Sequence, residues 1–393
     1  MILKLIKEAL STAASPWSAL WTFPSILLSA FVIAWGAEAA QFLMSQGLAL
    51  AILAWLQTMP EFAVEAVIAW GAGKDPAQTH LAIANFTGSL RLLVGLGWPM
   101  IYFVAAWFGW KRNRGFVKLH LDEEHSVEIF GLLLPILYFV FIWWKGTLTL
   151  WDAFPLSGFY FLYLFILWKI PPQEESEEAL DDLGVVPRKI LALPSTKRAV
   201  AIWSLFIAGG VMLYFAAHPF LNSMLALATG LGVSTFVFVQ WVAPFLSEFP
   251  EKLSAFYWAR KVTTANIALM NMVSSNINQW SILSAMIPVL FVISAGTIKP
   301  LPLDEMQRQE ILLTILQSFL GFLLLLNLEL RFHEALVLFV FWLTQFMIPS
   351  SRHTMIYVYL AWCIIELIRV VITERGVPRA WTGLRTTLAR RFA

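Results

Sequence analysis

Long apolar runs separated by short polar breaks recur along the whole chain. Each run is close to the about twenty residues that a helix needs to cross the hydrocarbon core of a bilayer. Short segments of alternating polarity, typical of an outer-membrane barrel, do not recur. The pattern therefore predicts an all-α polytopic membrane protein. Its runs, bounded by glycine, proline and charge, indicate about eleven spans near residues 17–46, 48–72, 80–109, 126–144, 147–168, 199–231, 233–258, 265–296, 309–330, 333–349 and 353–373.

One polar break is much longer than the others and divides the chain into two halves. It carries an acidic run followed by basic residues, which we interpret as a solvated linker rather than a calcium or partner site. The expected organisation is an N-terminal amphipathic segment (1–16), a first membrane repeat (17–169), a cytoplasmic linker (170–198), a second membrane repeat (199–350), and an extra C-terminal helix with a basic tail (351–393).

Composition narrows the functional class. Of the 393 residues, 59% are hydrophobic and only 13% are charged, whereas soluble domains carry about a quarter of charged residues. A soluble enzyme is therefore excluded, and the net charge of +2 gives no reason to expect a nucleic-acid partner. The sequence contains no nucleophile elbow, phosphate loop or metalloprotease spacing, so we expect neither enzymatic activity nor a cofactor. Cys363 is the single cysteine, which rules out an intramolecular disulfide.

The distribution of basic residues predicts the orientation. One side of the predicted spans collects Lys111, Arg112, Arg114, Lys118, Lys169, Arg188, Lys189, Lys197, Arg198, Lys252, Arg260, Lys261 and Arg331. Because cytoplasmic loops are enriched in lysine and arginine, the linker is expected in the cytoplasm and the N-terminus outside. We expect a bacterial-type inner or plasma membrane, with the lipid bilayer and inorganic cations as partners. The oligomeric state stays open.

Two pairs of matching segments indicate an internal repeat. LQTMPEFAVEAV around Glu61 matches LSEFPEKLSAFY around Glu251, and each is followed by a second piece, LAIANFTGSLRLL at 81–93 and ALMNMVSSNINQW at 268–280. Five predicted spans separate the copies, so the copies run in opposite directions through the membrane. The chain therefore contains an inverted-topology repeat, which is the usual plan of a secondary transporter.

The repeat brings two carboxylates to the middle of the membrane. Each costs roughly 2.5–3.5 kcal/mol on insertion scales, so a structural role alone is a weak explanation for Glu61 and Glu251. Pro60 and Pro250 each remove a helical hydrogen bond and leave a carbonyl oxygen free. Calcium takes about six to eight oxygen ligands, and helical spacing supplies more of them nearby. The candidate cation ligands are Glu61, Glu251, Glu248, Thr58, Gln57, Ser247, Ser89, Ser275, Asn85, Asn271 and Gln279.

These motifs resemble those of the calcium/cation antiporter superfamily, sodium/calcium exchanger type. The family's first element, G-T-S-L-P-E, has counterparts at 56–61 (LQTMPE) and 246–251 (LSEFPE). Its second element, G-N-x-x-G-S-N, has counterparts at 84–90 (ANFTGSL) and 270–276 (MNMVSSN). The resemblance covers about 17–350. It implies two inverted five-helix units that exchange calcium or a similar divalent cation for sodium or protons.

The sequence also departs from the family pattern. The opening glycine is leucine in both copies, Glu248 adds a third carboxylate, and Arg91 adds a cation inside the membrane. Three carboxylates less one arginine leave a charge of about −2. We therefore expect Arg91 to pair with Glu248 or a main glutamate as a tethered, charge-compensating cation. The alternative is that Arg91 extends to an interface and only anchors its helix.

Two functions from different classes remain open. The first is a secondary antiporter working by alternating access, with the ion held between Glu61 and Glu251 at the midplane. The second is a non-transporting membrane scaffold or sensor derived from the exchanger fold, with Arg91 occupying the ion site. An intramembrane enzyme is a distant third, because no catalytic constellation is present.

Overall fold

The computed structural model describes residues 18–75, 79–112, 118–172, 180, 183–230, 232, 243–373 and 377–392. The predicted N-terminal amphipathic segment (1–16) and the acidic run of the linker lie outside these ranges. The first half contains α2 (Ala19–Ala40), α3 (Gln46–Gln57), α4 (Met59–Lys74), α5 (Thr79–Leu92), α6 (Trp98–Lys111), α7 (Ser126–Lys145) and α8 (Ala153–Lys169). The second half contains α10 (Val185–Leu191), α11 (Ser195–Gly230), α13 (Ala243–Ser247), α14 (Phe249–Ala259), α15 (Ala265–Asn278), α16 (Ser284–Ala295), α17 (Glu305–Leu325), α18 (Phe332–Met347), α19 (Arg352–Thr373) and α20 (Arg379–Phe392).

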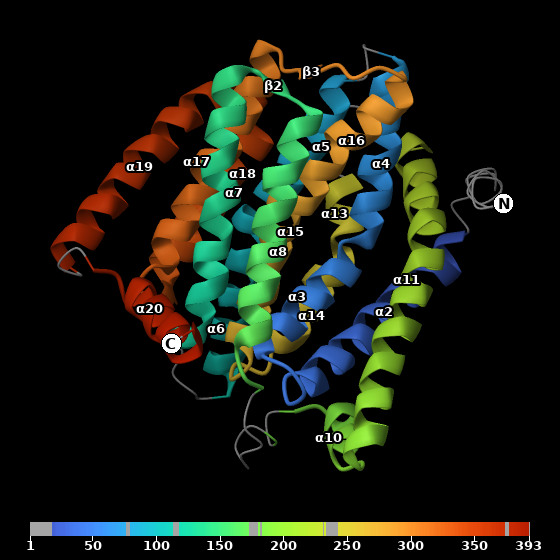
Figure 1. Ribbon diagram of the computed structural model, residues 1–393, viewed down its shortest axis with the longest axis vertical. Coiled ribbons are helices and arrows are strands. Elements are labelled where there is room, and N and C mark those ends of the chain that lie inside the picture. The colour runs from blue at the N-terminus through green and yellow to red at the C-terminus, as the bar shows by residue number, and fades with distance from the viewer. Residues whose placement is uncertain are drawn as a thin grey trace.

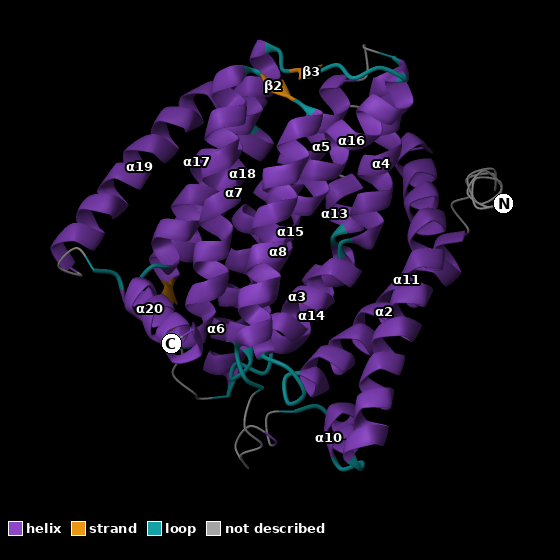
Figure 2. Ribbon diagram, in the orientation of Figure 1, coloured by secondary structure: helices purple, strands orange, loops and turns teal. Residues whose placement is uncertain are grey.

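Two very short antiparallel strand pairs join loops at the ends of this helical body (Figure 2). Strand β1 (Lys118–His120) pairs with β4 (Glu329–Arg331), and β2 (Thr147–Leu148) pairs with β3 (Leu301–Pro302). Each pair links a loop of the first half to a loop of the second half. The strands therefore hold the two halves together outside the apolar spans.

Eight helices of the described residues are long and apolar enough to cross a membrane, or nine if the bent pair α3–α4 counts as one span. Helix α18 is apolar but has 16 residues, and the predicted span 233–258 lies partly outside the described residues. The all-helical, multi-pass architecture is thus confirmed. The count of about eleven spans stays a prediction.

The bundle has a tilted pair of helices on one flank (Figure 1). Helix α2 packs against the long helix α11 there, while α19 packs on α17 at the opposite edge. Between these flanks, α3 packs on α15, α4 on α16, and α5 and α7 on α17. The central helices are therefore shared between the two halves of the chain, and each half completes the packing of the other.

Both halves break a helix just ahead of a glutamate. Helix α3 ends before Thr58 and α4 begins after it with a bend of 48°, and α13 and α14 are divided in the same way at Glu248. Pro60 and Pro250 lie in the first turn of the following helix, where a missing N–H is tolerated. The expectation of a proline in mid-helix is thus corrected: the chain breaks two residues earlier, and each proline starts a new helix.

A second interruption also recurs in both halves. The π-helical turn η3 (Leu93–Gly97) joins α5 to α6, and η7 (Gln279–Leu283) joins α15 to α16. The two turns are separated along the chain by the same interval as Asn85 and Asn271. Local π-helical turns are frequent at functional sites because they reorient the side chains around them.

Gly95 lies where two helical segments make their closest approach. A Cβ atom added to Gly95 would lie 2.2 Å from Cβ of Trp342 in α18, while one added to Gly158 in α8 would meet nothing within 4 Å. We expect Gly95→Ala to lower the free energy of unfolding by about 1–3 kcal/mol through overpacking. Gly158→Ala should be neutral or stabilising by up to about 1 kcal/mol. Melting of both variants in detergent checks this, and equal stability would contradict the tight contact.

The strand pair β1–β4 contains a carboxylate that predicts a response to acid. Burial alone would raise the pKa of Glu329, but hydrogen bonds and charge from Lys118 and Arg331 outweigh it and hold the pKa at about 2. The ionised Glu329 carboxylate contributes fully to stability above its ordinary pKa of about 4.5. This contribution is lost as pH falls from there towards 2.

We therefore expect Glu329→Gln to be less stable than the wild-type protein at pH 6. The difference should narrow as pH falls below about 4.5, because the carboxylate of the unfolded wild-type chain then takes up a proton, while the folded protein keeps Glu329 ionised down to about pH 2. Melting temperatures measured in detergent from pH 6 to pH 3.5 check this expectation. A difference that stays constant over that range would show that Glu329 does not carry the acid response.

Candidate cation site

Glu61 and Glu251 lie in the first turns of α4 and α14. Both are buried, with 1% and 0% of their surface exposed. The first turn presents unpaired backbone N–H groups and the positive end of the helix dipole, which stabilise a carboxylate. Each helix break therefore positions one glutamate, and Glu61 lies within electrostatic range of both Glu251 and Glu248.

One hydrogen-bond network joins carboxylates from the two halves. The Gln279 amide donates to Oε2 of Glu61 at 2.6 Å and also reaches Oε1 of Glu248 at 3.5 Å. The Ser89 hydroxyl donates to the same Glu248 oxygen, and the Lys252 ammonium donates to Oε2. The structure thus brings four predicted ligands together, with Lys252 beside them.

A second group of amides closes the site on the α14–α15 side. Asn271 donates to Oε1 of Gln57 at 3.2 Å, and Gln57 in turn donates to Oγ of Ser254 at 2.6 Å. Asn278, which the sequence did not single out, donates to Oγ1 of Thr58 at 2.6 Å. These contacts tie the residues at the end of α3 to α14 and α15.

Many buried oxygens here have no hydrogen-bond partner among the described residues. A buried acceptor without a partner is costly, and a cation is one partner that satisfies several such oxygens at once. The unpaired atoms are Oε1 of Glu61, Oδ1 of Asn271, Oδ1 of Asn278, Oε1 of Gln279 and the two carboxylate oxygens of Glu251, which have only the Ser275 hydroxyl close to them. Their number and chemistry fit a hard cation, which takes about six to eight oxygens when it is calcium.

The donor set is mixed rather than purely acidic. Within the described residues, no group of three or more His, Cys, Asp or Glu side chains is placed to hold a metal ion. Amide and hydroxyl oxygens must therefore supplement the carboxylates. Such neutral ligands suit an ion that has to be released again, since fewer charges hold it.

Two predicted ligands lie at the edge of this arrangement. Asn85 donates to Oε2 of Glu65 at 2.7 Å, and Ser247 is the buried last residue of α13. Glu65 is a further carboxylate that was not among the predicted ligands; it is fully buried, and its Oε1 is unpaired. It follows Glu61 by four residues and so shares its helix face. This spacing of four residues is the sequence feature that could have predicted Glu65 as part of the site.

The prediction that Arg91 pairs with Glu248 or a main glutamate is wrong. Its guanidinium is fully buried and bonds Glu310 of α17 and Gln345 of α18, while Arg352 holds the other oxygen of Glu310 at 2.8 Å. Arg91 therefore neither compensates Glu248 nor extends to an interface. It joins α5 to the C-terminal helices.

Lys252 also differs from its expected place. The sequence grouped it with basic residues at the cytoplasmic side of the spans, but its side chain is only 6% exposed and pairs with Glu248. Lys252 follows Glu248 by four residues, and this spacing was the signal that could have predicted the pair. The charge compensation expected from Arg91 is thus supplied by Lys252.

Comparison with known protein families identifies the family of this chain. The model of the family described as sodium/calcium exchanger protein matches residues 14–169 and 201–349. The chain belongs to the sodium/calcium exchanger family. The resemblance drawn from the two repeated motifs is confirmed, and the described spans are those of an integral, multi-pass membrane protein. Members of this family are secondary transporters and not enzymes.

Solved structures of this family share the fold. The crystal structure of the H+/Ca2+ exchanger CAX has a TM-score of 0.78 and 30% identity, covering 98% of this chain and 94% of that one. A structure of the sodium-calcium exchanger NCX_Mj has a TM-score of 0.62 and 16% identity, covering 84% and 97%. A search of curated protein sequences finds no match.

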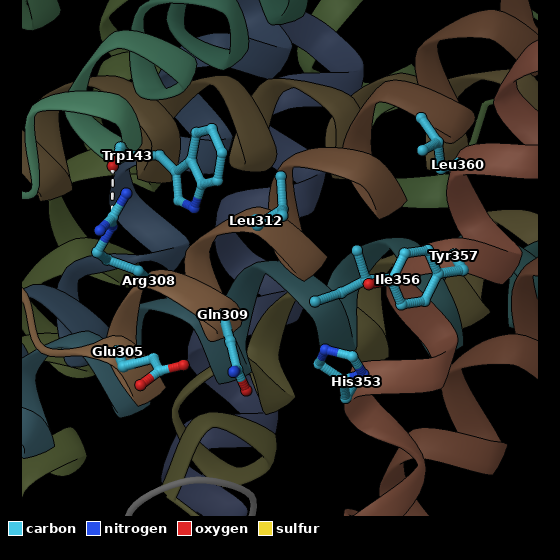
Figure 3. Close-up of a pocket in the computed structure, with 9 residues that line it drawn as sticks. All are labelled: Trp143, Glu305, Arg308, Gln309, Leu312, His353, Ile356, Tyr357 and Leu360. Atoms are coloured by element: carbon cyan, nitrogen blue, oxygen red, sulfur yellow. Dashed lines mark hydrogen bonds between the residues drawn. The ribbon is translucent and has the colours of Figure 1, made fainter.

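A separate cavity of about 350 Å³ lies between α7, α17 and α19 (Figure 3). Trp143, Leu312 and Ile356 are among its lining residues, and the Arg308 guanidinium donates to the Trp143 carbonyl at 3.2 Å. None of the candidate cation ligands lines it. This cavity is therefore not part of the site around Glu61 and Glu251.

Proposed function

We propose that this exchanger-family protein is a secondary active cation antiporter. It exchanges calcium or a similar divalent cation for sodium or protons by alternating access, with the ion held between Glu61 and Glu251 at the membrane midplane. The observation that carries the proposal is the group of unpaired buried oxygens around these two glutamates. The CAX and NCX_Mj relatives, which are named as calcium exchangers, support the choice of ion.

The proposed architecture is two inverted five-helix repeats plus an extra C-terminal helix, about eleven spans in all. The paired helix breaks at Thr58 and Glu248 and the paired π-helical turns support such a repeat, because each feature occurs at matching positions of both halves in the described residues. We place the linker in the cytoplasm and the N-terminus outside on the positive-inside rule. Movement of the tilted α2–α11 pair against the rest would expose the ion to one side at a time.

Flux through purified protein in liposomes tests the proposal. In one arm, vesicles loaded with sodium are diluted into sodium-free medium that contains calcium. In the other arm, vesicles with a low internal pH are diluted into calcium medium at a higher pH. We expect calcium uptake driven by one of the two outward gradients, which also identifies the counter-ion. Protein-free vesicles set the background. No uptake in either arm, with the protein folded, would reject antiport.

The alternative is a membrane scaffold or sensor that retains the fold without transport. It requires Arg91 to occupy the ion site, whereas Arg91 pairs with Glu310. The unpaired oxygens around Glu251 also argue against it, because a locked site would satisfy them. Silent flux in both arms would favour this alternative.

A further inference from the structure

The Glu248–Lys252 pair is a buried ion pair within the cation site. Lys252 lies in the first turn of α14, four residues after Glu248 at the helix break, and its ammonium donates to Oε2 of that carboxylate. Oε1 of the same carboxylate receives Ser89 and Gln279, and Gln279 also bonds Glu61. The Lys252 ammonium is therefore linked to Glu61 through the side chains of Glu248 and Gln279.

The surroundings keep this ammonium where it is. The Lys252 side chain is 6% exposed, and Nζ lies 5.7 Å from the centre of the Phe245 ring, where the ring face attracts a cation. A buried charge separated from its partner is strongly unfavourable. The ammonium thus holds the position beside Glu248 that a small monovalent ion would otherwise take.

The pair occurs in one half of the protein only. In the first repeat, the positions that match Glu248 and Lys252 hold Thr58 and Phe62, both uncharged. At these two matched positions, the second repeat has both the carboxylate and the ammonium, and the first repeat has neither. Together they add no net charge to the site, while each alone would change its charge by one unit.

We propose that Lys252 acts as a tethered monovalent cation on Glu248 and lowers by one the number of monovalent ions exchanged per divalent ion. The inference rests on the proposed antiport and concerns its stoichiometry. A mobile ion bound at Glu248 would be carried with each cycle, whereas the ammonium is bound covalently and stays. Removing the ammonium and keeping the carboxylate should therefore create one more transported monovalent ion.

The test compares Lys252→Met with Glu248→Gln/Lys252→Met in liposomes whose membrane potential is held at zero. Under a tenfold outward gradient of the driving ion, one added ion per cycle raises the equilibrium calcium accumulation about tenfold. We expect this rise in Lys252→Met and a return to the wild-type ratio in the double variant. Separate sodium and proton gradients identify the added ion. Accumulation at equilibrium does not depend on turnover, so slow variants can still be compared.

Two results would overturn the inference. One is the wild-type accumulation ratio in Lys252→Met, and the other is a raised ratio that persists in the double variant. If a protein moves no calcium, the dependence of its melting temperature on sodium or proton concentration in detergent replaces flux. Lys252→Met should then bind one more monovalent ion than wild type, and an equal number overturns the inference. If the wild-type protein moves no calcium, the proposed antiport is rejected. The melting measurement does not depend on transport, so it still tests the number of bound ions.

Discussion

Glu61→Gln and Glu251→Gln are each expected to reduce calcium uptake to the background of protein-free vesicles. Glutamine keeps the volume of the side chain and removes its charge. Two unit charges 4 Å apart interact by about 4 kcal/mol at an effective dielectric of 20, which corresponds to an affinity change of about a thousandfold. Loss of one carboxylate from a site for a divalent ion should be at least this severe. Gradient-driven calcium flux at several calcium concentrations is the measurement.

The fold should survive these substitutions. Glutamine at position 61 retains an oxygen that accepts the bond from Gln279, and both carboxylate oxygens of Glu251 are unpaired in the described structure. Glu366→Gln is the matched control, since Glu366 is a buried carboxylate of α19 paired with Arg369 outside the site. It should transport normally. Wild-type flux in Glu61→Gln would place the cation elsewhere.

Arg91→Met is expected to destabilise the protein without changing its transport stoichiometry. The substitution removes the bonds to Glu310 and Gln345 and the bond to the Thr87 carbonyl. Breaking a buried ion pair costs about 3–5 kcal/mol, and we expect about 3 kcal/mol because Arg352 still holds Glu310. The melting temperature in detergent and the calcium accumulation ratio in liposomes measure the two effects separately.

Two further variants make this expectation specific. Arg91→Lys keeps the charge but loses the forked geometry, so its stability should lie between wild type and Arg91→Met. Arg112→Met, an exposed arginine whose guanidinium donates to the Lys261 carbonyl, should cost less than about 0.5 kcal/mol. A stable Arg91→Met with an altered accumulation ratio would return Arg91 to the ion site and reject its assigned structural role.

The candidate site was predictable in part, because two of its features are local. A glutamate in an apolar run is recognised from its neighbours alone, and Glu61 and Glu251 stood out for this reason. The repeated motif then related them to each other. The positions of the helix breaks were harder to predict. The prolines indicated a lost hydrogen bond, while the break lies two residues earlier, at Thr58 and Glu248 between the two helices of each half.

The sequence by itself determined that the chain is a helical membrane protein of the exchanger type, because hydropathy sets the depth of each residue and the motifs repeat. Only the tertiary structure decided the partners of the buried charges. Depth does not specify which neighbouring helix a side chain faces, since that depends on helix rotation and packing between segments far apart in the chain. Arg91 therefore pairs with Glu310, 219 residues away, and Lys252 takes the compensating place beside Glu248.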